Sequence, residues 1–373
     1  MRAEIVVDLA AVRANVATLR RRVGVPLMAV VKADGYGHGM VPVARAARAG
    51  GAEWLGAAVL EEALALREAG DEGRILTWLT VPGEEYRPAV EQGIDLTAYT
   101  VEEADEVAAA ARSVGRTARL QLKVDTGLSR GGSTAALWPA LVGRAAALEE
   151  SGDVLVTGVW SHLACADEPG HPANDSQERA FREALAVAED AGLAPEVRHL
   201  ANSAGALYLP GARFDLVRTG LAIYGLAPAP AVDTAEELGL VPAMSVRAEL
   251  AAVKRIPAGQ GVSYGHTFHV ERDSTVVVVP VGYADGVPRN ASSKADVLVG
   301  GTRRRVAGRV CMDQFVVDVG DDDVSPGDPV VLFGSGAAGE PTAQDWADAC
   351  DTISYEIVSR VGGRMSRRYE DGT

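Results

Sequence analysis

The sequence contains little cysteine, no long apolar run and no excess of basic residues. Its 373 residues include only three cysteines, Cys165, Cys311 and Cys350, which are far apart and form no Cys-x-x-Cys pair. We therefore expect neither disulfides nor a structural zinc site, and a reducing compartment such as the cytoplasm. No apolar run approaches the roughly 20 residues that cross a bilayer. The first residues lack the apolar core and cleavage site of a secretory signal, so we expect none.

The charge balance is acidic. Lys and Arg number 36 against 51 Asp and Glu, which gives a net charge of −15. Binding to phosphate backbones or anionic lipids needs basic patches, so this balance disfavours nucleic acid and membranes as partners. We interpret the local basic run 303–305 as the solvated face of a strand-like segment.

Apolar runs rich in β-formers alternate with Ala-rich, charged segments of helical character from residue 28 to residue 220. Asp8 is a good N-cap for a further helix before them. The eight runs lie at 28–32, 54–59, 74–79, 95–99, 119–125, 155–162, 196–202 and 214–220. Eight strands alternating with helices predict an α/β fold, a (β/α)8 barrel of the TIM type, with a doubly wound open sheet as the competing interpretation.

The pattern changes after residue 225. A segment rich in Pro and Ala, 225–244, is typical of a linker, and the strand-like segments after it have no long helices between them. We therefore predict two domains, a barrel over residues 1–235 and a smaller, mostly β C-terminal domain over residues 236–373.

Polar and cationic side chains follow several of the predicted strands. In such barrels the chemistry collects at the C-terminal ends of the strands. The residues at or just beyond these ends are Lys32, Tyr36, Lys123, Arg130, His162, Asn202, Ser203, Arg218 and Gly220. No His/Cys cluster with metal-ligand spacing accompanies them, so we expect no metal. A cationic, hydrogen-bonding mouth in an acidic protein suits an anionic small ligand.

A phosphate-bearing aldehyde would explain this set of residues. The amine of Lys32 could form a Schiff base with the aldehyde in a partly dry pocket. Ser203, Thr219 and Gly220 could donate hydrogen bonds to the phosphate, as the loops after strands seven and eight often do in such barrels. Each residue taken singly has a simpler structural explanation, such as a strand-end charge for Lys32, and only the combination favours a site.

The segment AVVKADGYGHG, residues 29–39, resembles the pyridoxal-phosphate lysine motif of alanine racemases. Further segments resemble that family in the same order along the chain. They are LKVDTGLSR (122–130), SHLACAD (161–167), ANSAG (201–205), FDLVRTGLAIYGL (214–226), VSYGHTF (262–268), VGYADGVPR (281–289), GRVCMDQFVVDVG (308–320) and YEIVSRVGGR (355–364). The resemblance covers essentially the whole chain, with the small departure that Ser129 stands where the family often has glycine.

The resemblance implies an amino-acid racemase, an isomerase that interconverts L-alanine and D-alanine. Pyridoxal 5′-phosphate would be bound to Lys32, and the reaction would pass through an external aldimine with two bases on opposite faces. Lys32 would be one base and Tyr264 the other. The ordinary pKa of each group is near 10, so both pKa values must be lowered for work at neutral pH. The product would be D-alanine for peptidoglycan.

The resemblance also implies the contacts around the cofactor and substrate. The phosphate would be held by Tyr36, Ser203, Gly220, Leu221 and Tyr355. Arg218 would face the pyridine nitrogen and, as a permanent donor, would leave that nitrogen unprotonated and so limit side reactions. His162 would link Arg218 towards Tyr264.

The substrate carboxylate would be bound by Arg130, near the cofactor phenolic oxygen, and by the backbone N–H of Met312. Lys123, which is carbamylated in some family members, would support Arg130. Tyr264 and Met312 lie in the predicted β domain, so the family implies a head-to-tail homodimer with composite active sites.

Two alternatives stay open from the sequence. One is another enzyme of this architecture, a broad-specificity amino-acid racemase or a decarboxylase, although a decarboxylase would place a carboxylate where Arg218 stands. The other is a non-catalytic pyridoxal-phosphate carrier, which would resemble the barrel alone.

Several conspicuous residues are interpreted as structural. These are Cys311 and the histidines His171, His199, His266 and His269, which lack metal spacing. The G-x-G-x-x-G match at 334–339 precedes only a short helix, so we do not expect a dinucleotide there.

Overall fold

The computed structural model describes residues 2–372 and divides them into two compact units. One unit consists of Val12–Gly35 and Gly39–Leu240. The other contains the described residues up to Ala11 and from Val241 onward, together with the short segment Tyr36–His38. We call them the barrel unit and the β unit.

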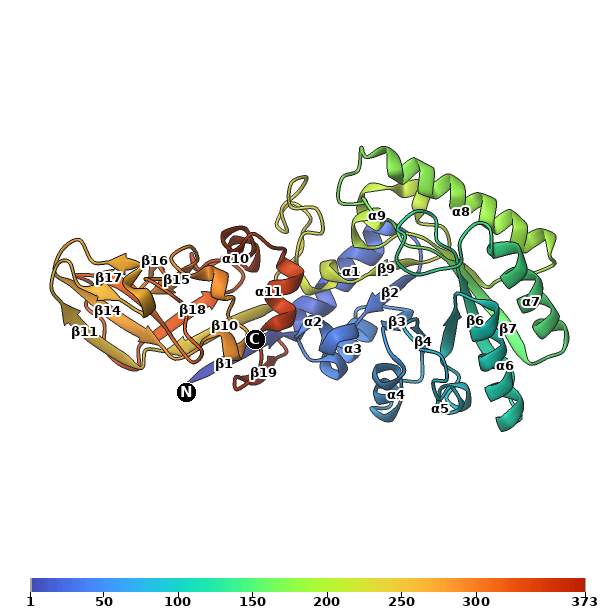
Figure 1. Ribbon diagram of the computed structural model, residues 1–373, viewed down its shortest axis with the longest axis horizontal. Helices are drawn as coiled ribbons and strands as arrows, with labels where there is room; N and C mark the ends of the chain where they lie inside the picture. Colours follow the sequence, from blue (N-terminus) through green and yellow to red (C-terminus); the bar gives the residue numbers. More distant parts are fainter. Residues whose placement is uncertain (1, 373) are drawn as a thin grey trace. The chain divides into compact units, whose positions relative to one another are not determined.

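The barrel unit contains a single sheet of eight parallel strands in the order β8-β7-β6-β5-β4-β3-β2-β9 (Figure 1). The strands are β2 (Leu27–Val30), β3 (Trp54–Ala57), β4 (Arg74–Thr77), β5 (Asp95–Ala98), β6 (Ala118–Lys123), β7 (Val154–Trp160), β8 (Val197–His199) and β9 (Val217–Thr219). Between β8 and β9 the backbone N–H of Arg218 donates to the carbonyl of Ala201 at 3.0 Å, which nearly closes the sheet. The predicted barrel is confirmed, and each predicted run overlaps one of its strands.

Helices alternate with the strands and cover the outer face of the sheet (Figure 1). They are α1 (Leu9–Val23), α3 (Met40–Ala49), α4 (Leu60–Glu68), α5 (Arg87–Glu91), α6 (Val101–Val114), α7 (Trp138–Glu150), α8 (Pro172–Asp190) and α9 (Ser203–Tyr208), with the 3-10 turns η1 (Pro210–Ala212) and η2 (Leu221–Tyr224). Asp8 caps α1 as predicted, since its Oδ1 accepts a hydrogen bond from the N–H of Ala11 at 3.0 Å. Large apolar side chains, among them Met28, Trp54 and Trp160, pack together as one buried cluster.

The β unit is built from three small sheets. A six-stranded sheet has the order β16-β15-β18-β10-β1-β19, a three-stranded sheet β11-β14-β17, and β12 pairs with β13. Their bounds are β1 (Ala3–Asp8), β10 (Met244–Glu249), β11 (Ala252–Ile256), β12 (Gly261–Val262), β13 (Phe268–His269), β14 (Ser274–Val279), β15 (Asp296–Val299), β16 (Thr302–Arg305), β17 (Phe315–Gly320), β18 (Pro329–Phe333) and β19 (Ser366–Glu370). The remaining elements are η3 (Tyr264–His266), η4 (Tyr283–Asp285), η5 (Arg289–Ala291), α10 (Ala343–Cys350) and α11 (Ser354–Arg360).

The sequence did not predict β1. This strand pairs antiparallel with β10 and parallel with β19, so the N-terminal residues belong to the β unit by packing. The division at residues 235 and 236 stays a prediction. The basic run 303–305 lies in β16, where its three arginines form ion pairs with Asp345, Asp322 and Asp296.

Lys32 does not end a strand, which corrects the prediction. Strand β2 ends at Val30, and Lys32 begins the short element α2 (Lys32–Tyr36). Ala33, Asp34, Gly35 and Tyr36 have φ angles of 53°, 51°, 62° and 53°, so this turn is left-handed. A left-handed residue other than glycine costs roughly 1–2 kcal/mol. The turn is held by hydrogen bonds, including one from the N–H of Met40 to Asp34 Oδ1 at 2.9 Å.

Gly37 continues the left-handed backbone with a φ of 80°. A Cβ atom at this position would lie 2.2 Å from the carbonyl oxygen of Val358 in α11. The glycine after the lysine turn therefore lets two backbone segments of the β unit approach closely.

Among residues 2–372, no helix has both the length and the apolar character required to cross a membrane. In the same range, no group of three or more His, Cys, Asp or Glu side chains is arranged to hold a metal ion.

We predict that Gly37→Ala lowers the apparent Tm more than Gly24→Ala does. Both substitutions place alanine in a left-handed conformation, with φ of 80° and 73°, and share a cost of roughly 1–2 kcal/mol. Only Gly37→Ala also clashes with a carbonyl, because a Cβ at Gly24 has no atom within 4 Å. The clash should add about 1–3 kcal/mol. Thermal unfolding by circular dichroism measures the difference, and equal losses would contradict the proposed close approach.

Candidate active site

Five cationic or imidazole side chains gather at the barrel mouth. Lys32, Lys123, Arg130, His162 and Arg218 come from the ends of four strands or the loops after them, and neighbouring charges of this group add to burial in lowering the pKa values of Lys32, Lys123 and His162. The structure thus brings together the barrel residues that the sequence singled out for chemistry. The cluster is rich in positive charge, which suits an anionic ligand.

Lys32 is a partly buried amine with a depressed pKa. Burial is the main cause, and the nearby charge of Arg130 lowers the pKa further, while Glu62 acts in the opposite direction. Glu62 also accepts a hydrogen bond from the backbone N–H of Ala33 at 2.7 Å, which connects α4 to the lysine turn. A lysine in this state is a better nucleophile and base at neutral pH than an exposed one.

Lys123 is more deeply buried, with 5% of its surface exposed. Its Nζ lies 4.4 Å from the ring centroid of Trp160 and 5.1 Å from that of Tyr99. Burial, followed by the charge of Arg218, lowers its pKa to about 7. Within residues 2–372 its amine has no hydrogen bond or ion pair, so aromatic faces are its main neighbours.

Arg218 is buried among hydrogen-bond acceptors. Its Nη1 donates to Nδ1 and to the carbonyl of His199 at 2.9 and 3.1 Å. Its Nη2 donates to the carbonyls of Ser161 and Leu200 at 2.7 and 3.0 Å and faces Nδ1 of His162 at 3.2 Å. Burial lowers its pKa to about 9, so the guanidinium is charged at neutral pH. Of its N–H groups, only Nε–H has no partner in the described part of the chain, and this donor is available to a ligand.

The two histidines beside Arg218 have a defined protonation. A guanidinium can only donate, so Nδ1 of His199 must accept, and Nδ1 of His162 can act towards Arg218 only as an acceptor. Burial and the charge of Arg218 lower the pKa of both rings well below 6.5, which keeps them neutral. The sequence analysis treated His199 as structural and did not connect it with Arg218. The missed signal is that His199 ends β8, where barrel chemistry collects.

Ser203, Gly220 and Leu221 lie together beyond β8 and β9. Asn202 caps α9 by accepting a hydrogen bond from the N–H of Gly205 at 2.9 Å, and Ser203 is the first residue of that helix. The Oγ of Ser203 accepts from the N–H of Gly220 at 2.9 Å, and Leu221 begins η2 directly after it. Hydroxyl and backbone donors at adjacent helix starts form a set suited to a phosphate.

The loop after β6 carries Arg130. Asp125 holds this loop, because its Oδ1 accepts hydrogen bonds from the N–H groups of Gly127 and Ser129 at 2.9 and 3.1 Å. Ser129 has a φ of 56°, in the left-handed region that glycine adopts without strain. This conformation explains why glycine is favoured at the position.

The other predicted site residues lie in the β unit. Tyr264 begins η3 and is 71% exposed, and Met312 is 53% exposed in the turn before β17. The rings of Tyr36 and Tyr355 are 6.1 Å apart, and burial raises the pKa of Tyr36, so its hydroxyl stays protonated.

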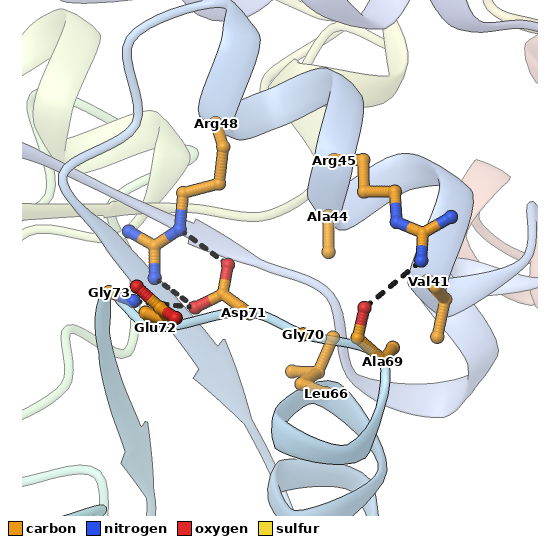
Figure 2. A pocket seen from close by; sticks show the side chains of 10 residues that line it. All are labelled: Val41, Ala44, Arg45, Arg48, Leu66, Ala69, Gly70, Asp71, Glu72 and Gly73. Carbon is orange, nitrogen blue, oxygen red and sulfur yellow. Dashed lines mark hydrogen bonds and ion pairs between the residues drawn. The ribbon is translucent and has the colours of Figure 1, made fainter.

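A hollow of about 370 Å³ lies between α3 and the end of α4 and contains none of the predicted site residues (Figure 2). Arg48 lies in the wall of this hollow, and its Nε, Nη1 and Nη2 atoms all donate hydrogen bonds. The Nε and Nη2 atoms of Arg48 donate to Asp71 at 2.8 Å each, and further bonds reach backbone carbonyls such as that of Glu53. Because these donors are already satisfied, we interpret the hollow as a structural feature of the barrel wall.

We predict that Lys123→Met raises the Tm at pH 6 and that the gain shrinks as the pH rises towards 10. The folded pKa of about 7 lies below the ordinary value near 10.4, so the unfolded chain binds the extra proton between these values. The free energy of unfolding contributed by Lys123 therefore rises with pH over this window, by at most about 1.4 kcal/mol per pH unit. The measurement is thermal unfolding in buffers freed of CO2.

The matched control for this substitution is Lys254→Met, which changes an exposed lysine on β11. The control should show no comparable pH-dependent gain. If Lys123→Met and Lys254→Met had the same pH profile, the buried amine would not carry the predicted penalty.

Known proteins resemble this chain along nearly its whole length. Residues 7–228 match the family model "Alanine racemase, N-terminal domain" and residues 243–369 match "Alanine racemase, C-terminal domain". Proteins named alanine racemase from Frankia casuarinae and Salinispora arenicola are 58% and 57% identical, over 98% and 99% of this chain and 95% and 98% of their own lengths.

Two solved structures are similar throughout. The alanine racemase from D-cycloserine-producing Streptomyces lavendulae has a TM-score of 0.99 at 57% identity, and that from Streptomyces coelicolor A3(2) has 0.98 at 55% identity. Each comparison covers 100% of this chain and 98% of the other. The chain therefore belongs to the alanine racemase family.

Proposed function

We propose that the protein is a pyridoxal 5′-phosphate-dependent alanine racemase that interconverts L-alanine and D-alanine. The observation that carries the proposal is the buried Arg218, which has acceptors on both Nη atoms and one open donor at Nε. Such a group suits a pyridine nitrogen that is to receive a hydrogen bond and no proton. A decarboxylase of this architecture would need a carboxylate at the same place.

The barrel residues fit this cofactor by their chemistry. The Lys32 amine has a lowered pKa, as attack on an aldehyde requires. Ser203 and Leu221 would supply donors for the phosphate beside Gly220, whose N–H orients the Ser203 hydroxyl, and Tyr36 and Tyr355 would add hydroxyl groups. When bound, the cofactor supplies the electron sink that makes the α-proton of the amino acid removable.

Two bases on opposite faces would move that proton. Lys32 Nζ would take or return it on one face, and its depressed pKa makes both directions accessible near neutral pH. The Tyr264 hydroxyl would do the same on the other face, and His162 would join it to the Arg218 network. Arg130 and the Met312 N–H would hold the substrate carboxylate in the geometry that exposes the α-proton.

Lys123 would support Arg130. At its pKa of about 7 a large share of this amine is neutral at physiological pH, which is the form that reacts with CO2. Carbamylation would convert a cation into an anion beside Arg130, and so would relieve the crowding of positive charge at the mouth.

We further propose a homodimer with composite sites. The exposure of Tyr264 and Met312 supports this, since catalytic side chains that act on a partner's barrel must project from the β unit. The three unpaired cysteines suit a cytoplasmic location. The product would serve as the D-alanine of peptidoglycan.

The test is incubation of L-alanine with the purified protein in deuterated water, followed by chiral analysis and mass spectrometry. We expect a racemic mixture with deuterium at the α-carbon, and no conversion with Lys32→Ala. Tyr264→Phe should keep the cofactor colour and lose roughly 10²–10⁴-fold in rate. Tyr369→Phe, a partly exposed tyrosine on β19, is the matched control and should behave as the unmodified protein. Cofactor colour without any D-alanine would contradict the proposal and favour a pyridoxal-phosphate carrier.

The composite site predicts complementation between two inactive variants. Lys32→Ala and Tyr264→Phe chains are co-expressed with different tags, and dimers are allowed to form at random. Each mixed dimer would contain one site with both bases and one with neither, so activity should return to roughly a quarter of the unmodified level. A mixture as inactive as its components would place both bases of a site on one chain.

A further inference from the structure

A row of buried polar side chains continues from Arg218 through the interior of the barrel. Strand β6 contributes alternate residues to it, since Arg119, Gln121 and Lys123 share one face. Gln121 is fully buried, and so are Asp95 at the start of β5 and His199 at the end of β8. The proposed catalytic roles use none of Gln121, Asp95 and His199. A polar group that is buried without a hydrogen-bond partner costs stability, so this row of buried polar side chains needs an explanation.

The hydrogen bonds in this row have only one consistent direction. Arg218 donates to Nδ1 of His199, so the ring proton must lie on Nε2. Nε2 is 2.7 Å from Oε1 of Gln121 and donates to it. The amide nitrogen of Gln121 then faces Oδ1 of Asp95 at 3.4 Å and donates in turn. We call this series, Arg218 to His199 to Gln121 to Asp95, the barrel hydrogen-bond chain.

The barrel backbone is shaped to hold Gln121. The pairing of β6 with β7 shifts register between Leu120 and Gln121, so that Leu120 pairs with Val156 and Gln121 with Gly158. Thr157 is the extra residue, and its hydroxyl donates to Asp95. Gly158 leaves room for the amide, because a Cβ there would lie 2.7 Å from Cδ and Oε1 of Gln121. Bulges of this kind redirect side chains at functional positions.

The carboxylate of Asp95, at the far end of the barrel hydrogen-bond chain, is held in place, and its negative charge is balanced by two arginines. Arg74 donates to Asp95 at 3.0 and 3.2 Å, and Arg119 donates at 3.1 Å. Both arginines also bind the partly exposed Glu196, so two guanidinium groups balance two carboxylates at the floor of the barrel. Asp95 therefore remains an acceptor and cannot exchange roles with Gln121.

We propose that Gln121 and Asp95 are positioning residues of the active site, which fix the proton of His199 on Nε2 and so keep Nδ1 as the acceptor that orients Arg218. If His199 carried its proton on Nδ1, two donors would face each other and Arg218 would move. The catalytic consequence rests on the proposed function, because it assumes that the open Nε–H of Arg218 serves the cofactor. The protonation itself is a property of this chain alone.

Neutron diffraction of the deuterium-exchanged protein with its cofactor tests the protonation directly. We expect deuterium on Nε2 of His199, none on Nδ1, and the amide nitrogen of Gln121 turned towards Asp95. Deuterium on Nδ1, on both ring nitrogens, or a reversed amide would overturn the proposal. This result is independent of racemase activity, so a failure of the proposed function would be recognised separately by the absence of D-alanine.

Gln121→Met tests the effect on the site, because it keeps the length of the side chain and removes both hydrogen bonds. We expect kcat to fall roughly 10- to 100-fold, as when outer hydrogen-bond partners of functional histidines are removed. The visible absorption of the bound cofactor should also shift, because the donor at its pyridine nitrogen moves.

The matched control is Thr97→Val, which removes a buried hydrogen bond of 2.8 Å to the Thr77 carbonyl inside the same barrel. It should lower the Tm and leave kcat and the absorption band unchanged. An unshifted band and unchanged kcat in Gln121→Met would overturn the proposal. If that variant does not fold, the neutron structure decides.

Discussion

The structure depends most on a charged guanidinium that is kept inside a parallel barrel. Arg218 is surrounded by three backbone carbonyls and two imidazole nitrogens, all of them acceptors. Isolated charges in such an interior are expensive, and this one is tolerated because its Nη hydrogens are matched by fixed partners. The same matching leaves Nε–H as the donor that a ligand can use. Burial, followed by the charge of Arg218, lowers the pKa of both histidines and of Lys123, and His199 connects Arg218 to the buried Gln121.

The sequence was sufficient for the fold because parallel barrel strands are buried on both faces and appear as continuous apolar runs. All eight runs overlapped a strand, and the alternation with helices predicted the barrel. The ends of the strands were predicted less accurately. Lys32 was placed at the end of a strand, whereas it begins a left-handed turn. Backbone handedness there depends on hydrogen bonds, such as that from the Ala33 N–H to Glu62 in α4, which no local pattern encodes. Strand β1 was missed because its two partners, β10 and β19, are distant in the sequence.

The sequence predicted the candidate site as a set of residues, and in the structure the members from the barrel unit lie close to one another. Motif resemblance supplied Tyr264, Met312 and Tyr355, which spacing alone would not have suggested. His199 and Gln121 were not found, since their importance lies in contacts between strands, at distances of 2.7–2.9 Å to residues far along the chain. The usable signal was the alternation of polar residues along β6, where Arg119, Gln121 and Lys123 share a face that should be apolar in an ordinary core.

The pairing of β1 with both β10 and β19 has a consequence for synthesis on the ribosome. Glu4 pairs with Arg247 on one side and with Ser366 on the other, so β1 must wait for two strands that are synthesised much later before its sheet is complete. The barrel strands are all translated before β10 and β19. Each pairs with a strand next to it in the sequence, except that β9 pairs with β2. Non-local strand pairing is slow to form, and an unpaired strand is prone to pair with other chains. In the nascent protein one edge of β1 can therefore pair with β10 first, while its other edge stays open until β19 has been made.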